Sequence, residues 1–236
     1  MFKNYSLFVQ EIHDIDKDEI IMYELLLRKF EKGRWGFPEV IFQQEFMETK
    51  YSFFVEWFQN EVEKALKNLN FAPVSININS TQFFYIETLQ MLERLRKYSD
   101  NITIEITEDL MLIPEHKHHL TLKEIDAYLY GKISSLKSMG YKILLDDVSC
   151  GINSLERATY YTPVVDGFKF SVRNLKLSTA KLFVEAWQNF AVQSKKQFIL
   201  ENIEDFSMSE EFQSIGLNLQ QGYFLDKPAN LHECVS

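Results

Sequence analysis

The alternation of short apolar runs with longer amphipathic segments constrains this chain more than any other feature of its sequence. Eight runs, rich in β-branched and aromatic residues, have the length of strands and cover residues 5–12, 20–28, 74–79, 102–107, 142–148, 165–170, 198–203 and 217–225. Apolar residues at helical spacing separate most of these runs, over residues 51–69, 82–98, 123–139 and 179–193. Strands that alternate with helices predict βα units and a largely parallel sheet.

Eight strands with intervening helices in 236 residues predict an α/β fold, a single (β/α)8 TIM-like barrel. The first junction is different, because only residues 13–19 separate the first two runs. A parallel crossover needs roughly ten residues or more. We therefore predict one antiparallel strand near the N-terminus. No linker, repeat or low-complexity tract divides the chain, so we expect residues 1–236 to form one domain without a fused sensor.

Charge and hydropathy exclude several classes of function. A net charge of −9 without a Lys/Arg run argues against binding to polymeric nucleic acid. No apolar run approaches the ~20 residues that span a bilayer, and no signal segment precedes the first strand. We therefore expect no membrane partner and a cytoplasmic location. The chain has only two cysteines, which agrees with this location. A small phosphorylated substrate fits an acidic pocket only if bound cations invert its local charge.

Polar residues interrupt the predicted strands, most of them near the C-terminal ends, where barrels of this type carry their active sites. In chain order they are Glu24, Asn77, Glu105, Asp146 with Asp147, Lys169, Glu201 and Gln221. A single carboxylate in a strand is ordinarily a surface or edge residue. Several that converge are costly to bury unless a cation compensates their charge. Oxygen ligands with one amide among them suit Mg²⁺ or Mn²⁺ better than Zn²⁺.

The adjacent Asp146 and Asp147 narrow this interpretation. Neighbouring strand residues point to opposite faces, so both carboxylates can reach one site only where the strand ends and the chain turns. Asp146 is then placed to bridge two cations and Asp147 to bind the second, as in-line phosphoryl chemistry with metals roughly 3.5–4 Å apart requires. An Asp pair before a loop with Ser and Gly fits a helix-capping turn equally well.

The motifs around these residues resemble, in the same order, those of the EAL family of cyclic di-GMP phosphodiesterases. The similar segments are Glu-Leu-Leu-Leu-Arg at 24–28, Ser-Ile-Asn at 75–77, Glu-Ile-Thr-Glu at 105–108, Asp-Asp at 146–147, Lys169, Glu-Asn-Ile-Glu at 201–204, and Gln-Gly-Tyr at 221–223 with Pro228. The resemblance spans nearly the whole chain, and the family's barrel also begins with an antiparallel pair. It implies hydrolysis of cyclic di-GMP to linear pGpG by two divalent cations, Mg²⁺ or Mn²⁺, and an activated water.

The resemblance also implies roles for individual residues, and a homodimer. Glu24, Asn77, Glu105 and Asp146 would hold the first metal, with Asp146 and Asp147 on the second. Lys169 would orient the water or hold its hydroxide form, and Glu201 would be a metal ligand or the general base. Arg28, Leu26 and Gln221 would contact the substrate or its water. Glu108 would steady the loop after the Asp pair, although a Glu there equally fits the first turn of a helix.

Three departures from the family pattern leave other functions open. Val148 and Ser149 stand where the family has Phe and Gly, which removes a packing anchor and easy access to positive φ. Ser171 replaces an Asp that could position Lys169. A catalytically weak or inactive barrel that binds cyclic di-GMP as a sensor through its dimer is therefore the alternative, and a barrel that acts on another phosphodiester is a third.

Two further groups invite a functional interpretation but favour ordinary ones. His116, His118 and His119 lie in a polar loop and predict a solvated surface rather than a metal site. Cys150 follows the Asp pair, and a small buried thiol is the expectation.

Overall fold

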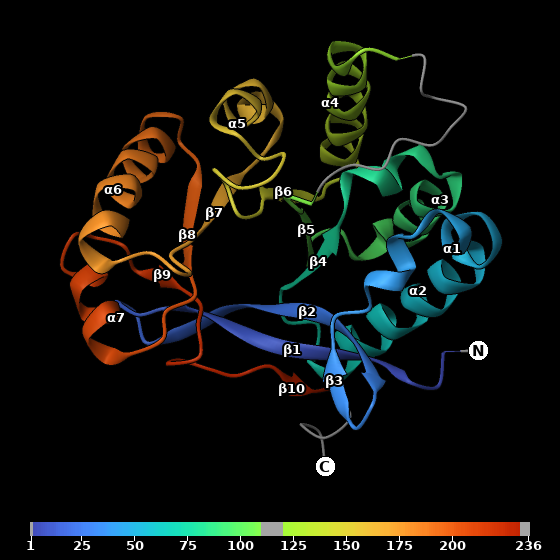
Figure 1. Ribbon diagram of the computed structural model, residues 1–236, viewed down its shortest axis with the longest axis horizontal. Helices are drawn as coiled ribbons and strands as arrows, with labels where there is room; N and C mark the ends of the chain where they lie inside the picture. The colour runs from blue at the N-terminus through green and yellow to red at the C-terminus, as the bar shows by residue number, and fades with distance from the viewer. Residues whose placement is uncertain (1, 110–119, 232–236) are drawn as a thin grey trace.

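The computed structural model describes residues 2–109 and 120–231, which form a closed barrel of eight strands (Figure 1). Its strands are β1 (Tyr5–Asp14), β2 (Glu19–Glu31), β4 (Val74–Ile78), β5 (Ile102–Ile106), β6 (Lys142–Leu145), β7 (Gly167–Ser171), β8 (Gln197–Glu201) and β9 (Leu219–Gln220). Each lies within or close to a predicted run, so the predicted fold class is confirmed. The histidines at 116, 118 and 119 lie outside the described residues.

The reversed strand is β1. It pairs antiparallel with β2 on one side and with β9 on the other, whereas β2 and the strands from β4 to β9 run parallel around the barrel. The antiparallel ladder continues as far as Asp14 opposite Glu19, so only four residues make the turn. The prediction from the short first connection is therefore confirmed.

Helices surround the barrel except along the β1–β2 hairpin, which has no crossover helix (Figure 1). They are α1 (Gln44–Thr49), α2 (Tyr51–Asn68), α3 (Ile86–Leu95), α4 (Leu122–Ser138), α5 (Leu155–Tyr161), α6 (Leu177–Gln193) and α7 (Phe206–Gln213). Single 3₁₀ turns cover Glu39–Phe42, Ser80–Phe84, Arg96–Tyr98 and Thr162–Val164. None of the described helices is long and apolar enough to cross a bilayer.

Some elements differ from the sequence-based expectation. The predicted helix over 82–98 is broken at Tyr85, whose backbone is extended, because Asn79 and Gln82 form a capping box around a 3₁₀ turn. The last predicted strand is only two residues long, since Gly222 leaves the ladder and passes against the main chain of Ile203 too closely for a Cβ. Short elements escaped the periodicity analysis: β3 (Arg34–Gly36), β10 (Ala229–Asn230), α1, α5 and α7.

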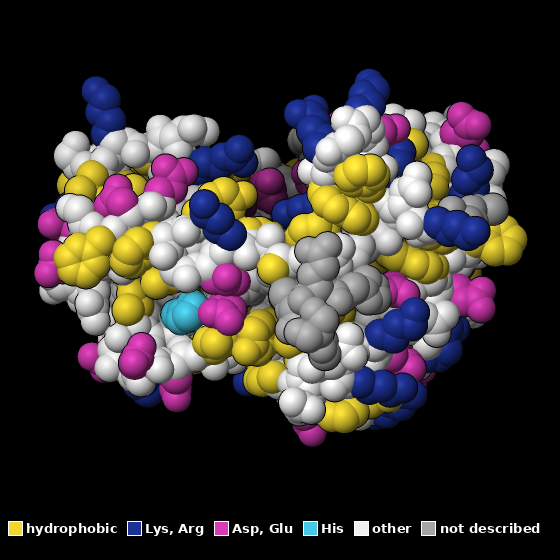
Figure 2. Space-filling model, turned by 90° about the horizontal axis from the view of Figure 1, so that it is seen from below, with side chains coloured by type: hydrophobic (Ala, Val, Ile, Leu, Met, Phe, Trp, Pro, Cys, Tyr) yellow, Lys and Arg dark blue, Asp and Glu magenta, His cyan; other side chains and the backbone are white. Residues whose placement is uncertain are grey.

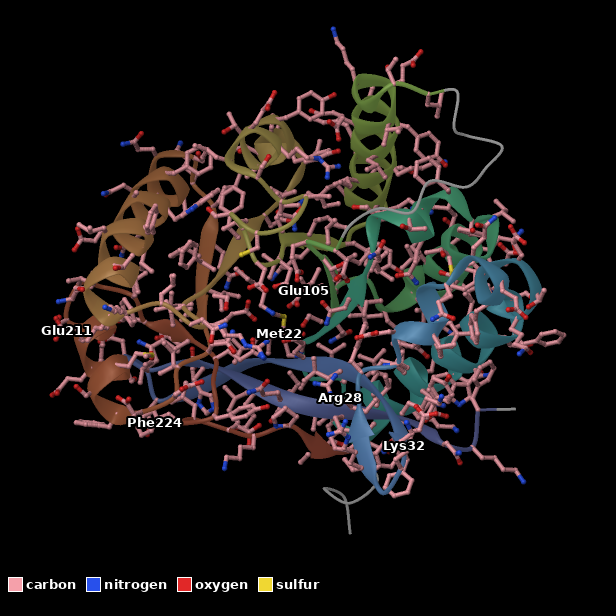
Figure 3. The ribbon with its side chains drawn as sticks, viewed as in Figure 1. Met22, Arg28, Lys32, Glu105, Glu211 and Phe224 are labelled. Atoms are coloured by element: carbon pink, nitrogen blue, oxygen red, sulfur yellow. The ribbon has the colours of Figure 1, made fainter. Side chains whose placement is uncertain are left out.

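The interior of the barrel is layered. Met22, Leu144 and Ile199 pack with Ile12 in a small apolar cluster separate from the main core. Two residues further along the chain come Glu24 in β2, Glu201 in β8 and Asp146, the residue directly after β6, and alternation directs them toward the same inner face. An apolar floor therefore lies beneath a polar layer at the C-terminal ends of the strands, and Figure 3 shows Met22 and Glu105 near the centre of the barrel.

Seen from the side of the β1–β2 hairpin, Lys and Arg side chains are interspersed with Asp and Glu (Figure 2). A nucleic-acid backbone is ordinarily bound by a continuous basic surface. This face shows no such surface, in keeping with the net charge of −9.

Candidate active site

Lys169 lies at the centre of the polar layer and is fully buried. Its Nζ is 2.7 Å from Glu105 Oε2, 2.7 Å from Glu201 Oε1, 3.1 Å from Glu24 Oε2 and 3.7 Å from Asp146 Oδ1. Burial alone would lower the pKa of Lys169, but the surrounding carboxylates raise it well above its usual value. The side chain therefore remains a cation, and one cation faces four acidic groups.

The carboxyl groups respond unequally to this crowding. Burial raises the pKa of Glu105 to about 8, and it also raises the pKa values of Asp146 and Glu201. Burial acts in the same direction on Glu24, but the charge of Lys169 and hydrogen bonds from Asn77 (2.7 Å) and Gln221 (2.8 Å) leave its pKa below the usual value. When all four carboxyl groups are ionised, Lys169 alone does not balance their charge, and bound cations would.

Unpaired oxygens show what the cluster can hold. Among the described residues, buried oxygens without a hydrogen-bond donor include Asn77 Oδ1, Glu105 Oε1, Asp147 Oδ1 and Gln221 Oε1. Asp146, Asp147 and Glu201 also each offer an oxygen, and these lie within 4.8 Å of one another. Lone pairs left without donors in a buried site are costly unless a cation uses them. An all-oxygen set of this kind fits a hard divalent cation such as Mg²⁺ or Mn²⁺.

The backbone of the loop over residues 146–153 determines how the side chains of Asp146 and Asp147 are oriented. Asp147 has a φ of 42°, so the chain turns directly after β6, as the predicted convergence of both carboxylates requires. Asn153, which is buried, donates from Nδ2 to the carbonyl oxygens of Asp146 (2.6 Å) and Ile106 (2.9 Å). The capping interpretation of the Asp pair is wrong, because Ser154 caps the helix that follows.

A cavity of about 440 Å³ opens beside the cluster. Glu24, Asn77, Asp146 and Asp147 line it on the acidic side. Arg28 and Leu26 also line it, whereas Gln221 is buried and donates to Glu24. Figure 3 places Arg28 on β2, between the barrel centre and Lys32 in the turn that joins β2 to β3. Part of the cavity wall is aromatic and comes from the segment after β3 and from α2: Phe37, Phe54 and Phe58.

A model of the EAL domain family matches residues 3–228. The chain belongs to the EAL domain family. No curated protein matches it.

Solved structures of EAL proteins share its fold. The chain is 21% identical to the EAL enzyme Bd1971 in a form with bound cAMP and cyclic di-GMP, with a TM-score of 0.75 over 99% of this chain and 64% of that one. It is 20% identical to an EAL domain protein of Listeria monocytogenes EGD-e, with a TM-score of 0.75 over 98% and 91% of the two chains. Bacillus subtilis YkuI, in complex with cyclic di-GMP and calcium, is 17% identical, with a TM-score of 0.76 over 97% and 57%. The chain thus spans about two thirds of Bd1971.

Two residues of this EAL domain lie differently from expectation. Cys150 is exposed, so the predicted buried thiol is wrong; the left-handed backbone at Ser149 and Gly151 turns the residue between them outward. Ser171 accepts a hydrogen bond from Asn202 (2.8 Å), and without a carboxylate at position 171 Lys169 has Glu105 and Glu201 as acidic neighbours, each at 2.7 Å.

Sequence reasoning missed Arg173. This residue lines the cavity from the loop after β7, and its charge lowers the pKa of Asp147 against the stronger effect of burial. A basic residue just past the end of a barrel strand was the available signal.

Glu108 contacts the loop of this EAL domain through its main chain. Its carbonyl oxygen accepts a hydrogen bond from the amide of Ile152 (2.8 Å), and Gly151 packs against the same carbonyl. Glu108 lies outside any described helix, so the interpretation as a first-turn residue is wrong. Burial raises the pKa of its carboxyl group to about 7, with Asp147 adding to the effect.

Replacing Gly151 with alanine is expected to destabilise the domain by about 1–2 kcal/mol or more. Its φ of 46° disfavours a side chain, and an added Cβ would overlap the carbonyl oxygen of Glu108. Urea unfolding measures the change. Gly131→Ala is the matched control, because Gly131 lies in α4 with open space around it and should gain about 0.5–1 kcal/mol. A Gly151→Ala domain as stable as the wild type would contradict the loop path described above.

Proposed function

We propose that this EAL domain hydrolyses one phosphodiester bond of cyclic di-GMP to give linear pGpG, with two divalent cations, Mg²⁺ or Mn²⁺. The observation that carries the proposal is the set of buried, unpaired oxygens around Lys169, next to a cavity lined by Arg28. Related structures support it: YkuI was solved with cyclic di-GMP and calcium, and Klebsiella pneumoniae BlrP1 with cyclic di-GMP and manganese.

Each acidic residue has a place in this proposal. Glu24, Asn77, Glu105 and Asp146 would hold one cation, and Asp146 and Asp147 would hold the other. When bound, the cations would act as Lewis acids on the phosphate oxygens and would lower the pKa of a bound water towards neutrality. Glu201 would be a metal ligand or the general base, since one of its oxygens lies within 4.8 Å of oxygens of the Asp pair.

Lys169 and Arg28 provide the protein's own positive charge. Lys169 is fixed by its acidic neighbours and would hold the attacking water by hydrogen bonding and charge. Arg28 would bind a phosphate oxygen with its guanidinium group, for which a forked donor is well suited. Leu26 and the aromatic wall would contact the apolar faces of the bases. Gln221 and Glu108 would act indirectly, by holding Glu24 and the loop.

The affinity for metal is expected to rise with pH. In the metal-free site, burial raises the pKa of Asp147 to about 6 and that of Glu105 to about 8, so protons occupy these groups at lower pH. A cation must displace those protons, and its apparent affinity therefore increases as the pH rises from 6 to 8. Calorimetric titration with Mn²⁺ at pH 6, 7 and 8 measures this. An affinity that stays constant or falls over this range would contradict the assignment.

A sensor without turnover is the second candidate, favoured by the altered loop at Val148 and Ser149. Saturable binding of cyclic di-GMP in the presence of Mn²⁺, without appearance of pGpG, would select it. A panel that adds cAMP and cGMP separates a different phosphodiester substrate from both candidates. The homodimer implied by the resemblance and the cytoplasmic location expected from the sequence stay predictions.

A further inference from the structure

A side-chain hydrogen bond joins α6 to the loop that carries the Asp pair. Trp187 donates from Nε1 to Ser149 Oγ at 2.7 Å. The indole is only 5% exposed, and its ring packs against Phe168 (5.8 Å between centroids) and Phe190 (5.7 Å). Because Phe168 precedes Lys169 in β7, one aromatic side chain contacts both the strand of the lysine and the loop of the aspartates.

The loop needs such a restraint. Asp147, Ser149 and Gly151 have φ values of 42°, 78° and 46°, so three of five consecutive residues adopt left-handed backbone. Only glycine takes that conformation without a steric penalty, and Ser149 carries a Cβ. Main-chain bonds from Ser149 to Asn153 (2.8 Å) and from Val148 to Lys169 (2.9 Å) hold the backbone, and Trp187 holds the Ser149 side chain.

We propose that Trp187 is a positioning residue, whose indole N–H fixes Ser149 in its left-handed conformation and so places the Asp147 carboxylate for a divalent cation. The buried indole N–H of Trp187 donates its hydrogen bond to Ser149, and this bond restrains the side chain of Ser149. Where the family has glycine, Ser149 thus offsets the steric penalty of its Cβ with a side-chain hydrogen bond that glycine cannot form. The metal part of this inference rests on the proposed function, whereas the placement of the loop does not.

Substitutions on either side of the bond test it. Trp187→Phe keeps a ring for packing but removes the N–H, and Ser149→Ala keeps the Cβ but removes the acceptor. Both are expected to speed amide hydrogen exchange over residues 147–153 in metal-free protein and to weaken Mn²⁺ binding by about tenfold or more, as loss of a residue that orients a ligand typically does. Ser149→Gly is expected to keep slow exchange, because glycine adopts positive φ freely.

The double variant separates positioning from general packing. If Trp187 acts through Ser149, Trp187→Phe in a Ser149→Gly background adds no further change in loop exchange or Mn²⁺ affinity. Trp57→Phe is the matched control, since its ring packs against Phe54 and Tyr5, far along the chain from the loop. Unchanged loop exchange in Trp187→Phe, or an equal effect in both backgrounds, would overturn the proposal. If the wild type bound no Mn²⁺, the proposed function would fail, and the exchange comparison would still decide the positioning role.

Discussion

Replacing Lys169 with methionine is expected to destabilise the metal-free domain by about 3–5 kcal/mol at pH 8, because it leaves a buried acidic cluster without its central cation. Four carboxylates approach Lys169 Nζ within 3.7 Å. Without the lysine, the folded-state pKa values of Glu105, Asp146 and Glu201 rise further above their unfolded values, and Glu24 loses the charge that does most to lower its pKa. An acid with a raised folded-state pKa does not lower the free energy of unfolding below its unfolded pKa, and lowers it progressively as the pH rises above that value. The loss is therefore expected to be much smaller at pH 5.

Urea unfolding in the presence of EDTA at pH 5 and pH 8 measures this effect. Lys67→Met is a suitable control, because Lys67 is exposed on α2 and should change the free energy of unfolding by less than about 0.5 kcal/mol. Turnover of cyclic di-GMP should also fall steeply in Lys169→Met. A loss of equal size at both pH values would mean that Lys169 contributes packing rather than charge.

Asp146→Asn is expected to lower hydrolysis by roughly 10²–10³-fold while leaving the metal-free domain as stable or more stable at pH 8. Asp146 is the residue proposed to bridge both cations, and an amide in its place offers one neutral oxygen. Burial raises the pKa of Asp146, so its ionised form costs stability above the unfolded pKa, and the amide removes that cost.

To support the account, Asp146→Asn must lower hydrolysis without lowering the stability of the metal-free domain. Steady-state hydrolysis and urea unfolding, measured on the same preparation, provide the two readouts. Asp16→Asn, in the exposed turn between β1 and β2, serves as the control and should change neither. Hydrolysis at the wild-type rate would show that Asp146 is not required for the reaction, and a large loss of stability would indicate a structural role instead.

The barrel and the convergence of its polar residues were predictable because both depend on short-range patterns. The alternation of strand-like runs with helical segments predicted the barrel, and the short connection before Glu19 predicted the antiparallel pair. Residues near the C-terminal ends of parallel strands meet at one end of a barrel, so Glu105 and Lys169 could be brought together without coordinates.

Contacts between a helix and a loop could not be predicted in the same way. The bond from Trp187 to Ser149 joins residues 38 positions apart, and no periodicity relates them. The exposure of Cys150 and the early end of β9 depend on positive φ and on a close main-chain approach at Gly222, which are properties of the folded backbone. The sequence indicated that the loop differs from the family, and the structure shows which side chain restrains it.

The most direct test of the central claim is product formation from cyclic di-GMP by the purified domain. The protein is incubated with Mg²⁺ or Mn²⁺ and the nucleotides are separated by chromatography, with Glu24→Ala and an EDTA-treated sample in parallel. The account predicts that linear pGpG appears with at least one metal, and that Glu24→Ala and EDTA abolish it. Absence of pGpG with both metals, or product formation by Glu24→Ala at the wild-type rate, would contradict it.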